Sequence, residues 1–169
     1  MFDTDIDFKS LIRSGKKAGP ETKEFQASLL VKSIDEGKKQ ITAVVSTGTI
    51  DREGEIILPS AFKEKLPEYM KNPIVITGHQ HRLQTGHSSV VGKVVKAWID
   101  SKGLWVVIEF VKGTELADEY WMLYSTKTQR AFSVGFIPLE DNYEVREGKR
   151  IRVHTKVELI EISCVAVPA

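Results

Sequence analysis

The chain has 169 residues, of which 41% are hydrophobic and 28% are charged. This length and composition are typical of one globular domain with a substantial core. The 24 Lys and Arg residues nearly balance the 23 Asp and Glu residues, and the resulting net charge of +1 argues against nucleic acid as a partner. The apolar runs are short and interrupted, which argues against a membrane partner. The single cysteine excludes an internal disulfide and suits a reducing cytosol.

The N-terminal part of the chain divides into a lead-in and a first pair of strands. Residues 1–22 are polar and end in a glycine and proline cluster, so we expect a flexible lead-in before a single domain over residues 23–169. Apolar and polar residues alternate over residues 24–33, and residues 40–47 are rich in β-branched side chains. The turn residues between these segments predict a β-hairpin.

An irregular connection over residues 47–59 contains three acidic residues, Asp51, Glu53 and Glu55. Oxygen-rich loops can bind hard cations, so a metal site is one interpretation of this segment. The three acids lack the regular ligand spacing of a calcium loop. A solvated acidic turn is therefore the expected structure.

Two or three helices are expected. Ser60 can cap a short helix over residues 61–66, because its hydroxyl can accept a hydrogen bond from an unpaired backbone amide. The clearest helical pattern covers residues 114–127, where Thr114 can cap the first turn and apolar residues recur at helical spacing.

The remaining segments predict a mainly β fold. Further strands are predicted at residues 74–77, 90–99, 104–111, 130–137 and 155–167, with another hairpin within residues 141–148. Sequential strands joined by tight turns favour an antiparallel arrangement. The expected α+β fold is a closed antiparallel β-barrel of about seven to eight strands with two or three flanking helices.

The strand predicted at residues 130–137 carries a serine on a face of small residues. One face holds Phe132, Val134 and Phe136, and the other holds Ala131, Ser133 and Gly135. The first face is a core face. The second leaves room for a substrate or a base beside the Ser133 hydroxyl, although a strand serine taken alone usually has no chemical role.

Three of the four histidines, His79, His81 and His87, fall within nine residues after the buried strand at 74–77. One interpretation is a metal site, although no cysteine is nearby and the spacing matches no specific zinc pattern. The other is a general base at a strand end. His79 directly follows the strand, so packing fixes its position best, and we favour it as the base.

The last predicted strand carries a carboxylate opposite the expected core face. Alternation places Glu158, Ile160, Ile162 and Cys164 on one face and Leu159, Glu161 and Ser163 on the other. The first face is predicted to be core, which makes Cys164 a buried hydrophobic side chain and not a nucleophile. Glu161 can form a surface salt bridge or orient a catalytic base.

Three residue types needed for nucleophilic catalysis thus occur on separate predicted strands. A hydroxyl nucleophile needs a base, and the base benefits from an acid that orients it. Ser133, His79 and Glu161 fill these three roles by residue type. Their spacing in the sequence does not establish that they meet.

Four segments resemble, in the same order, the signature segments of the tailed-phage prohead (capsid maturation) proteases. These are residues 49–51 and 54–62 (TID, GEIILPSAF), 73–79 and 92–94 (PIVITGH, GKV), 132–136 (FSVGF) and 158–169 (ELIEISCVAVPA). The resemblance covers roughly residues 40–169. That family is similar in fold to the herpesvirus assemblins, which are serine proteases built on a closed β-barrel.

The resemblance implies a serine endopeptidase that needs no metal or organic cofactor. It would cleave scaffold and capsid proteins, and itself, inside the assembling prohead in the bacterial host cytoplasm. Carried over by position, Ser133 would be the nucleophile, His79 its base and Glu161 the acid that orients the imidazole. Glu158 is the alternative acid, and the alternation of side chains along the strand favours Glu161. His81 and His87 are not implied by the resemblance.

Several alternatives remain open at this stage. The chain can be a catalytically inactive capsid-assembly or scaffold-binding component with the same fold, or a metal hydrolase that uses the histidine cluster. A homo-oligomer is expected because assemblins are active as dimers. Backbone amides at 134–135 and the side chain of Arg130 are candidate oxyanion donors. The sequence stops at Ala169, where we would expect this family to continue, and a truncated form and a self-cleaved mature form both fit.

Overall fold

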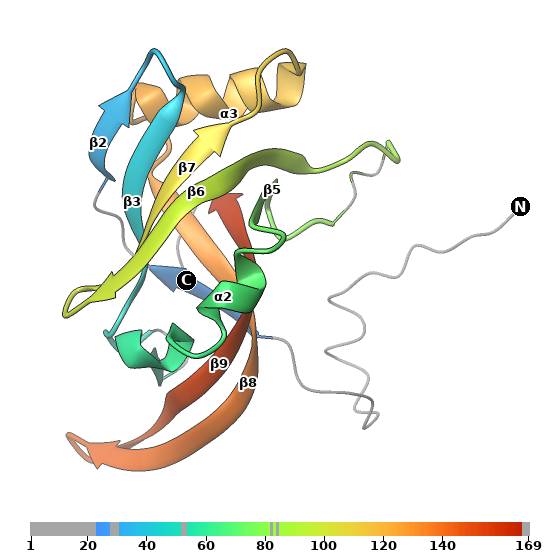
Figure 1. The fold of residues 1–169 in the computed structure, drawn as a ribbon. Coiled ribbons are helices and arrows are strands. Elements are labelled where there is room, and N and C mark those ends of the chain that lie inside the picture. Colours follow the sequence, from blue (N-terminus) through green and yellow to red (C-terminus); the bar gives the residue numbers. More distant parts are fainter. Residues whose placement is uncertain (1–22, 28–30, 52–53, 82, 84, 167–169) are drawn as a thin grey trace, which may run out of the picture.

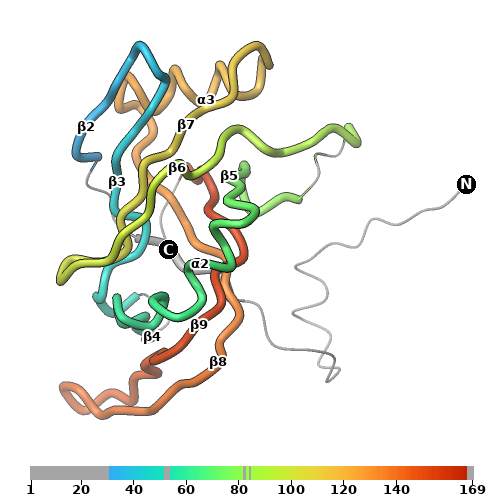
Figure 2. The backbone as a smooth tube through the Cα atoms, in the orientation of Figure 1, coloured from blue at the N-terminus to red at the C-terminus, as the bar shows by residue number. Residues whose placement is uncertain are grey.

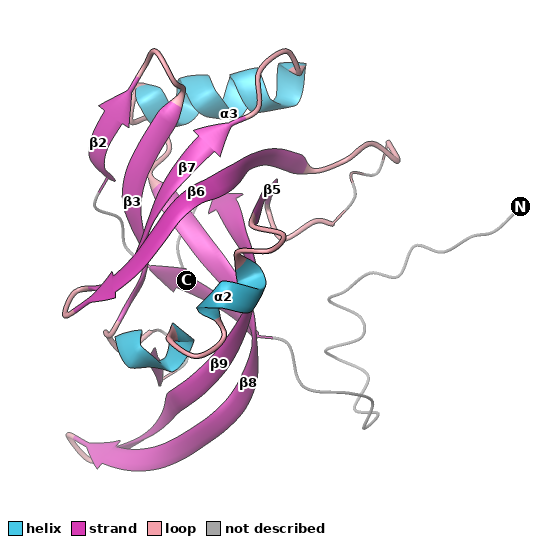
Figure 3. Cartoon of the chain, viewed as in Figure 1, coloured by secondary structure: helices cyan, strands magenta, loops and turns pink. Residues whose placement is uncertain are grey.

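The computed structural model describes residues 23–27, 31–51, 54–81, 83 and 85–166. The predicted lead-in over residues 1–22 lies outside these ranges. Strands dominate the described part of the chain, as Figure 3 shows. All nine strands of the described residues join one sheet, and the short helices lie against it (Figure 1). None of the described helices is long and apolar enough to cross a membrane.

The elements follow the predicted order, except that a short strand at residues 55–57 lies within the connection predicted to be irregular. The strands are β1 (Lys23–Ala27), β2 (Val31–Asp35), β3 (Gln40–Thr47), β4 (Glu55–Ile57), β5 (Ile74–Thr77), β6 (Val90–Asp100), β7 (Gly103–Phe110), β8 (Ala131–Arg146) and β9 (Lys149–Val165). The helices are the 3₁₀ helix η1 (Pro59–Phe62) and the α-helices α2 (Leu66–Tyr69) and α3 (Glu115–Ser125). The predicted β2–β3 and β6–β7 hairpins are both confirmed.

The predicted closed antiparallel barrel is wrong in two respects. The hydrogen-bonded path runs β1-β8-β9-β5-β6-β7-β3-β2 and stays open, because its two end strands, β1 and β2, are not paired with each other. The sheet is also mixed, since β4 and β5 both run parallel to β9. Both ends of this path come from the start of the domain. The single strand predicted over residues 24–33 is two strands, of which β1 pairs with β8 and β2 with β3.

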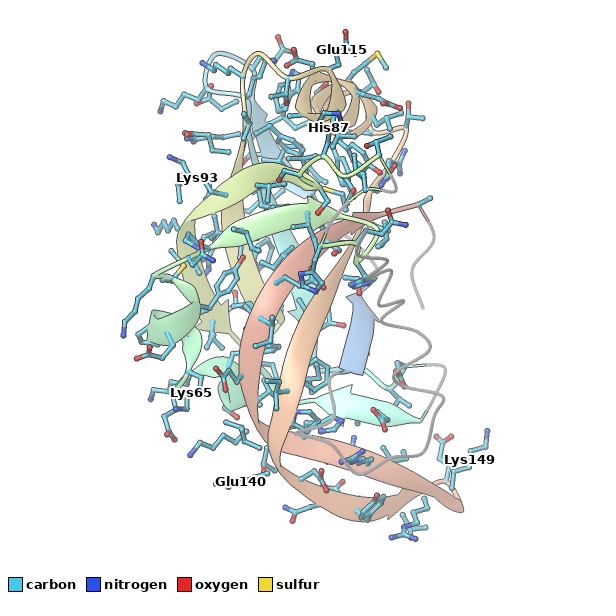
Figure 4. The ribbon with its side chains drawn as sticks, turned by 90° about the vertical axis from the view of Figure 1, so that its right-hand side faces the viewer. Lys65, His87, Lys93, Glu115, Glu140 and Lys149 are labelled. Atoms are coloured by element: carbon cyan, nitrogen blue, oxygen red, sulfur yellow. The ribbon has the colours of Figure 1, made fainter. Side chains whose placement is uncertain are left out.

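The longest strands, β8 and β9, form one hairpin of 16 and 17 residues. It turns at Glu147 and Gly148, whose φ angles of 51° and 75° are typical of a type I′ turn that matches the twist of the flanking strands. The hairpin predicted within residues 141–148 is thus the tip of a much longer one. Figure 4 shows Lys149 near this tip and Glu115 of α3 at the opposite end of the molecule.

The helix α3 confirms the strongest helical prediction. The Ala117 amide donates a hydrogen bond of 3.3 Å to the Thr114 hydroxyl, which caps the first turn. The buried ring of Tyr124 stacks on Phe132, with 4.6 Å between ring centroids, and so anchors the helix to the core face of β8. The Ser60 cap is wrong, because η1 begins at Pro59 and no side chain caps it.

Candidate active site

His79 is positioned by the end of β5. This strand runs parallel to β9 and pairs Val75 with Ile162 and Thr77 with Cys164; Figure 2 shows the two segments running side by side. The Gly78 amide continues the ladder with a 3.0 Å hydrogen bond to the Cys164 carbonyl. Gly78 and His79 then adopt left-handed φ angles of 51° and 60°, which turn the chain out of the sheet and leave His79 against β9.

His79 and Glu161 are in direct contact. His79 Nδ1 donates a hydrogen bond of 2.7 Å to Glu161 Oε1, because an ionised carboxylate can only accept. The two side chains are only 11% and 5% exposed, so solvent screens this interaction little. The contact fixes the ring orientation and places the proton of the neutral imidazole on Nδ1.

Gly135 provides the space that the Glu161 carboxylate occupies. The two residues are paired across β8 and β9. A Cβ atom built on Gly135 would lie 2.4 Å from Glu161 Oε1 and 2.9 Å from its Cδ, closer than real Cβ atoms approach other atoms. The glycine is therefore necessary for this position of the carboxylate, and any larger residue would displace it.

Ser133 lies on the same face of β8 as Gly135, two residues earlier, and is paired with Ser163 of β9. Its side chain is buried, as are Phe132, Val134 and Phe136 on the opposite face, which confirms the predicted core face. The structure thus brings His79 and Glu161 together and aligns Ser133 beside them on the neighbouring strand.

Ser163 is a site residue to which the sequence argument gave no role. Its hydroxyl donates a hydrogen bond of 2.6 Å to Glu161 Oε2 and accepts one of 3.1 Å from the His79 backbone amide. The available signal was the Glu-x-Ser spacing in the last strand, which places both side chains on one face.

Glu158, the alternative acid, lies further along β9 and is paired with Ile137 of β8. A bulge separates it from Glu161: Gly135 pairs with Glu161, but the next residue, Phe136, pairs with Leu159. Because a bulge reverses the alternation of side chains, Leu159 is in the core and Ile160 is only half-buried. The core face predicted for residues 158 and 160 was therefore wrong. The alternation of side chains nevertheless correctly separated Glu161 from Ile162 and Cys164.

Two other ionisable groups near Glu161 are held neutral. Burial, and to a lesser extent the charge of Glu161, raise the pKa of Tyr69 well above that of an ordinary phenol. Its hydroxyl donates a 2.9 Å hydrogen bond to the Ile74 carbonyl. Burial also raises the pKa of the Cys164 thiol well above its ordinary value, and the side chain packs in the core as predicted.

The two metal-site interpretations gain no support from the geometry. His81 and His87 are exposed, and the described residues contain no group of three or more side chains suited to a metal ion. In the acidic connection, Glu53 lies outside the described residues. Glu55 is buried and accepts a hydrogen bond of 3.2 Å from His154 Nε2, so the predicted solvated turn is wrong at this residue.

The candidate oxyanion donors lie in different settings. Val134 and Gly135 belong to β8, which is paired with β1 on one side and with β9 on the other. Their amides therefore lie within a sheet ladder. The exposed Arg130 side chain donates from Nε to the Lys127 carbonyl at 2.9 Å.

Comparison with known proteins identifies the family. The model of the caudovirus prohead serine protease family matches residues 28–169. The chain belongs to this family. The resemblance found in the four sequence segments is therefore confirmed.

Individual relatives agree with this assignment. The prohead protease of Escherichia phage T5 is 33% identical over 144 residues, which cover 82% of this chain and 64% of the T5 protein. The capsid polyprotein of Pseudomonas phage PAJU2 is 27% identical over 155 residues, covering 88% of this chain and 21% of the polyprotein. The chain thus spans less than two thirds of the length of the T5 protein and about a fifth of the length of the PAJU2 polyprotein.

A solved structure shares the fold. The capsid assembly protease of bacteriophage T4 matches with a TM-score of 0.62, covering 89% of this chain and 100% of the T4 chain. Only 9% of the aligned residues are identical, so this likeness supports the fold and not the roles of single residues.

Proposed function

We propose that the protein is a serine endopeptidase of phage capsid maturation in which Ser133 is the nucleophile, His79 its general base and Glu161 the acid that orients the base. The observation that carries this proposal is the 2.7 Å hydrogen bond between His79 and Glu161 on the same face of the sheet as Ser133. A histidine oriented by a buried carboxylate beside a strand serine has the composition and order of a Ser-His-acid hydrolase.

The proposed acylation step follows from the tautomer of His79. With its Nδ1 proton donated to Glu161, the lone pair on Nε2 can accept the Ser133 hydroxyl proton as Oγ attacks the scissile carbonyl carbon. The imidazolium that forms is stabilised by the adjacent Glu161 carboxylate. The tetrahedral intermediate collapses when His79 returns the proton to the leaving amine, which leaves an acyl ester on Ser133.

Deacylation repeats the cycle with water. His79 removes a proton from a water molecule that attacks the ester carbonyl, and the proton then passes to Ser133 Oγ as the acid product leaves. This two-step chemistry uses only protein groups and water. Amides at 134–135 or the Arg130 guanidinium are the proposed partners of the oxyanion in both steps.

The names of the relatives support capsid proteins as the substrates, and cleavage of scaffold proteins remains a prediction from the family resemblance. The T5 relative is a prohead protease, the PAJU2 relative is a capsid polyprotein, and the T4 neighbour is a capsid assembly protease. The proposed place of action is the assembling prohead in the host cytoplasm. Self-cleavage and a homo-oligomeric state remain predictions from the family resemblance.

Labelling with a fluorophosphonate probe tests this function directly, because the probe reacts with serines activated by a base. We expect the wild-type chain to be labelled and the variants Ser133→Ala and His79→Ala to lose labelling by about a thousand-fold or more. Ser46→Ala and His87→Ala are the matched controls, since Ser46 is a buried strand serine of β3 and His87 an exposed loop histidine. Both controls should label at the wild-type rate.

The alternative of an inactive capsid-assembly component predicts a different result. A folded wild-type chain of that kind would not be labelled, either alone or with capsid and scaffold proteins added. Circular dichroism of each sample would establish that an unlabelled protein is folded. That combination of results would rule out the proposed chemistry.

A further inference from the structure

Ser163 connects the two proposed partners of Ser133 through one hydroxyl group. Its Oγ lies 2.6 Å from Glu161 Oε2 and 3.1 Å from the backbone nitrogen of His79. A carboxylate only accepts and an amide only donates, so the direction of both hydrogen bonds is fixed. The single hydroxyl proton is committed to Glu161, and a lone pair accepts from His79.

In this arrangement each oxygen of the Glu161 carboxylate accepts a hydrogen bond from a different residue. Oε1 accepts from His79 Nδ1, and Oε2 accepts from Ser163. Because the two bonds hold opposite ends of the carboxylate, rotation about its terminal torsion is restricted. The packing of Gly135 against the same carboxylate restricts its translation, as the contacts of a Cβ there indicate.

Ser163 also fixes the backbone from which the base projects. His79 has a φ of 60°, which is uncommon for a residue other than glycine and persists only where neighbours hold it. The β5–β9 ladder ends with the hydrogen bond from Gly78 to Cys164. The next amide along the chain, that of His79, bonds to the Ser163 side chain, so the serine extends the anchoring by one residue.

Ser163 is placed opposite the proposed nucleophile but is not a second nucleophile. It is paired with Ser133 across β8 and β9, and side chains of directly opposed residues lie on one face. Its side chain is buried and its proton is held by a carboxylate that already binds His79. The hydroxyl is therefore engaged in holding its neighbours.

We propose that Ser163 is a positioning residue for the hydrolytic reaction, which it supports by locking the Glu161 carboxylate and the His79 backbone in one geometry. This inference rests on the proposed function of Ser133, His79 and Glu161. Charge-assisted hydrogen bonds to a carboxylate and correct placement of a base are each worth about 10–100-fold in equilibrium or rate.

The test is a double-mutant cycle on the rate of fluorophosphonate labelling of the full chain. Ser163→Ala should lower the labelling rate constant by about 10–100-fold in the wild-type background. In the background of Glu161→Ala the same substitution should change the rate by less than about three-fold, because its main partner is absent. Ser46→Ala, also a buried strand serine, is the matched control and should have no effect in either background.

A proton NMR measurement tests the positioning without relying on activity. The His79 Nδ1 proton in the short hydrogen bond to Glu161 should give a strongly deshielded resonance in the wild-type protein. Ser163→Ala should shift or broaden this resonance, whereas Ser46→Ala should leave it in place. Thermal unfolding of each variant identifies any protein that has simply failed to fold.

The outcomes separate the inference from the function on which it rests. If the wild type is labelled and Ser163→Ala is labelled equally fast, the positioning role is wrong and the proposed function stands. An equal loss of rate with and without Glu161 would mean that Ser163 acts through general stability, which also overturns the inference. A folded wild-type chain that is not labelled overturns both.

Discussion

The strand β9 contributes to two histidine–glutamate pairs that differ in almost everything except their composition. In one, Glu161 of β9 binds His79, which follows the parallel strand β5. In the other, His154 of β9 binds Glu55, which begins the parallel strand β4. The histidine of the first pair projects from a strand end, and that of the second lies inside the sheet.

The surroundings of the two pairs explain why only the first is proposed to act in catalysis. His154 is fully buried, with its ring edge against Phe136, and the neighbouring Arg152 and Asp141 form a 2.6 Å ion pair. His79 is slightly exposed and lies on the face that carries Ser133. A histidine–carboxylate contact is thus not sufficient for a hydrolase. The first pair differs by its position at a strand end, on the face of the sheet that carries the Ser133 hydroxyl.

The largest expected difference is between two variants in which either His79 or His154 is replaced by alanine. His79→Ala should slow the labelling of Ser133 by about a thousand-fold or more, because the proposed base is lost. His154→Ala should lower the unfolding free energy by about 3–5 kcal/mol, because it leaves Glu55 buried without this partner, and labelling of the folded protein should persist. Urea unfolding and probe labelling of both variants measure the two effects. A folded His154→Ala protein that is not labelled would contradict the division between the pairs.

A single methyl group at residue 135 should weaken the first pair selectively. Gly135→Ala places a Cβ within 2.9 Å of two Glu161 atoms, so the carboxylate must move away from His79. We expect the labelling rate to fall by about 10–100-fold. Gly37→Ala is the control, because its Cβ would meet only one atom, at an ordinary 3.6 Å. Equal labelling rates in these two variants would show that the position of Glu161 has no influence.

Removing the charge of Glu55 should affect stability alone. Glu55→Gln keeps the shape of the side chain but weakens its bonds to His154 and Arg152, and we expect a loss of about 1–3 kcal/mol in unfolding free energy. Urea unfolding measures this loss. Glu64→Gln, which removes a carboxylate paired with Lys156 at the exposed surface, should leave the unfolding curve unchanged. A slower labelling rate in Glu55→Gln would indicate that the two pairs are coupled.

The smallest expected effect concerns the thiol beside Ser163. Burial raises the pKa of Cys164 well above its ordinary value, so the thiol stays protonated at pH 8. A thiol reagent such as dithionitrobenzoate should therefore not react with the native protein at this pH, and reaction should begin only when urea unfolds it. Fast reaction in native buffer would mean that the core side of β9 opens near the site.

Local features of the fold were predictable from the sequence, and long-range ones were not. The β2–β3 and β6–β7 hairpins and the Thr114-capped helix depend on neighbouring residues, whose turn and capping chemistry the sequence displays. The parallel pairing of β4 and β5 with β9 joins distant segments without a turn between them. The same limit explains why residues 24–33 were predicted as a single strand. In the structure β1 pairs with β8 and β2 pairs with β3, at opposite ends of the sheet.

Within the site, alternation separated Glu161 from the core residues that follow it, although the expected pattern was incomplete. It placed Glu161 and Ile162 on different faces of the strand. It could not include the bulge that puts Leu159 in the core, because the amino-acid composition of a strand does not reveal one extra residue. The proposed role of Ser163 depends on the left-handed turn at His79. A backbone conformation of a residue other than glycine has no reliable sequence signal.

The long β8–β9 hairpin has a consequence for the order in which the site residues come together during synthesis. Ser133 and Glu161 lie on strands joined by a tight turn, whereas His79 and Glu161 are 82 positions apart. Synthesis proceeds from the N-terminus, so β5 has left the ribosome long before β9, which supplies both Glu161 and the parallel partner of β5. A growing chain therefore carries serine and histidine without the strand that unites them. The His79–Glu161 contact can form only in this late docking step, so the proposed triad is incomplete until β9 has been synthesised.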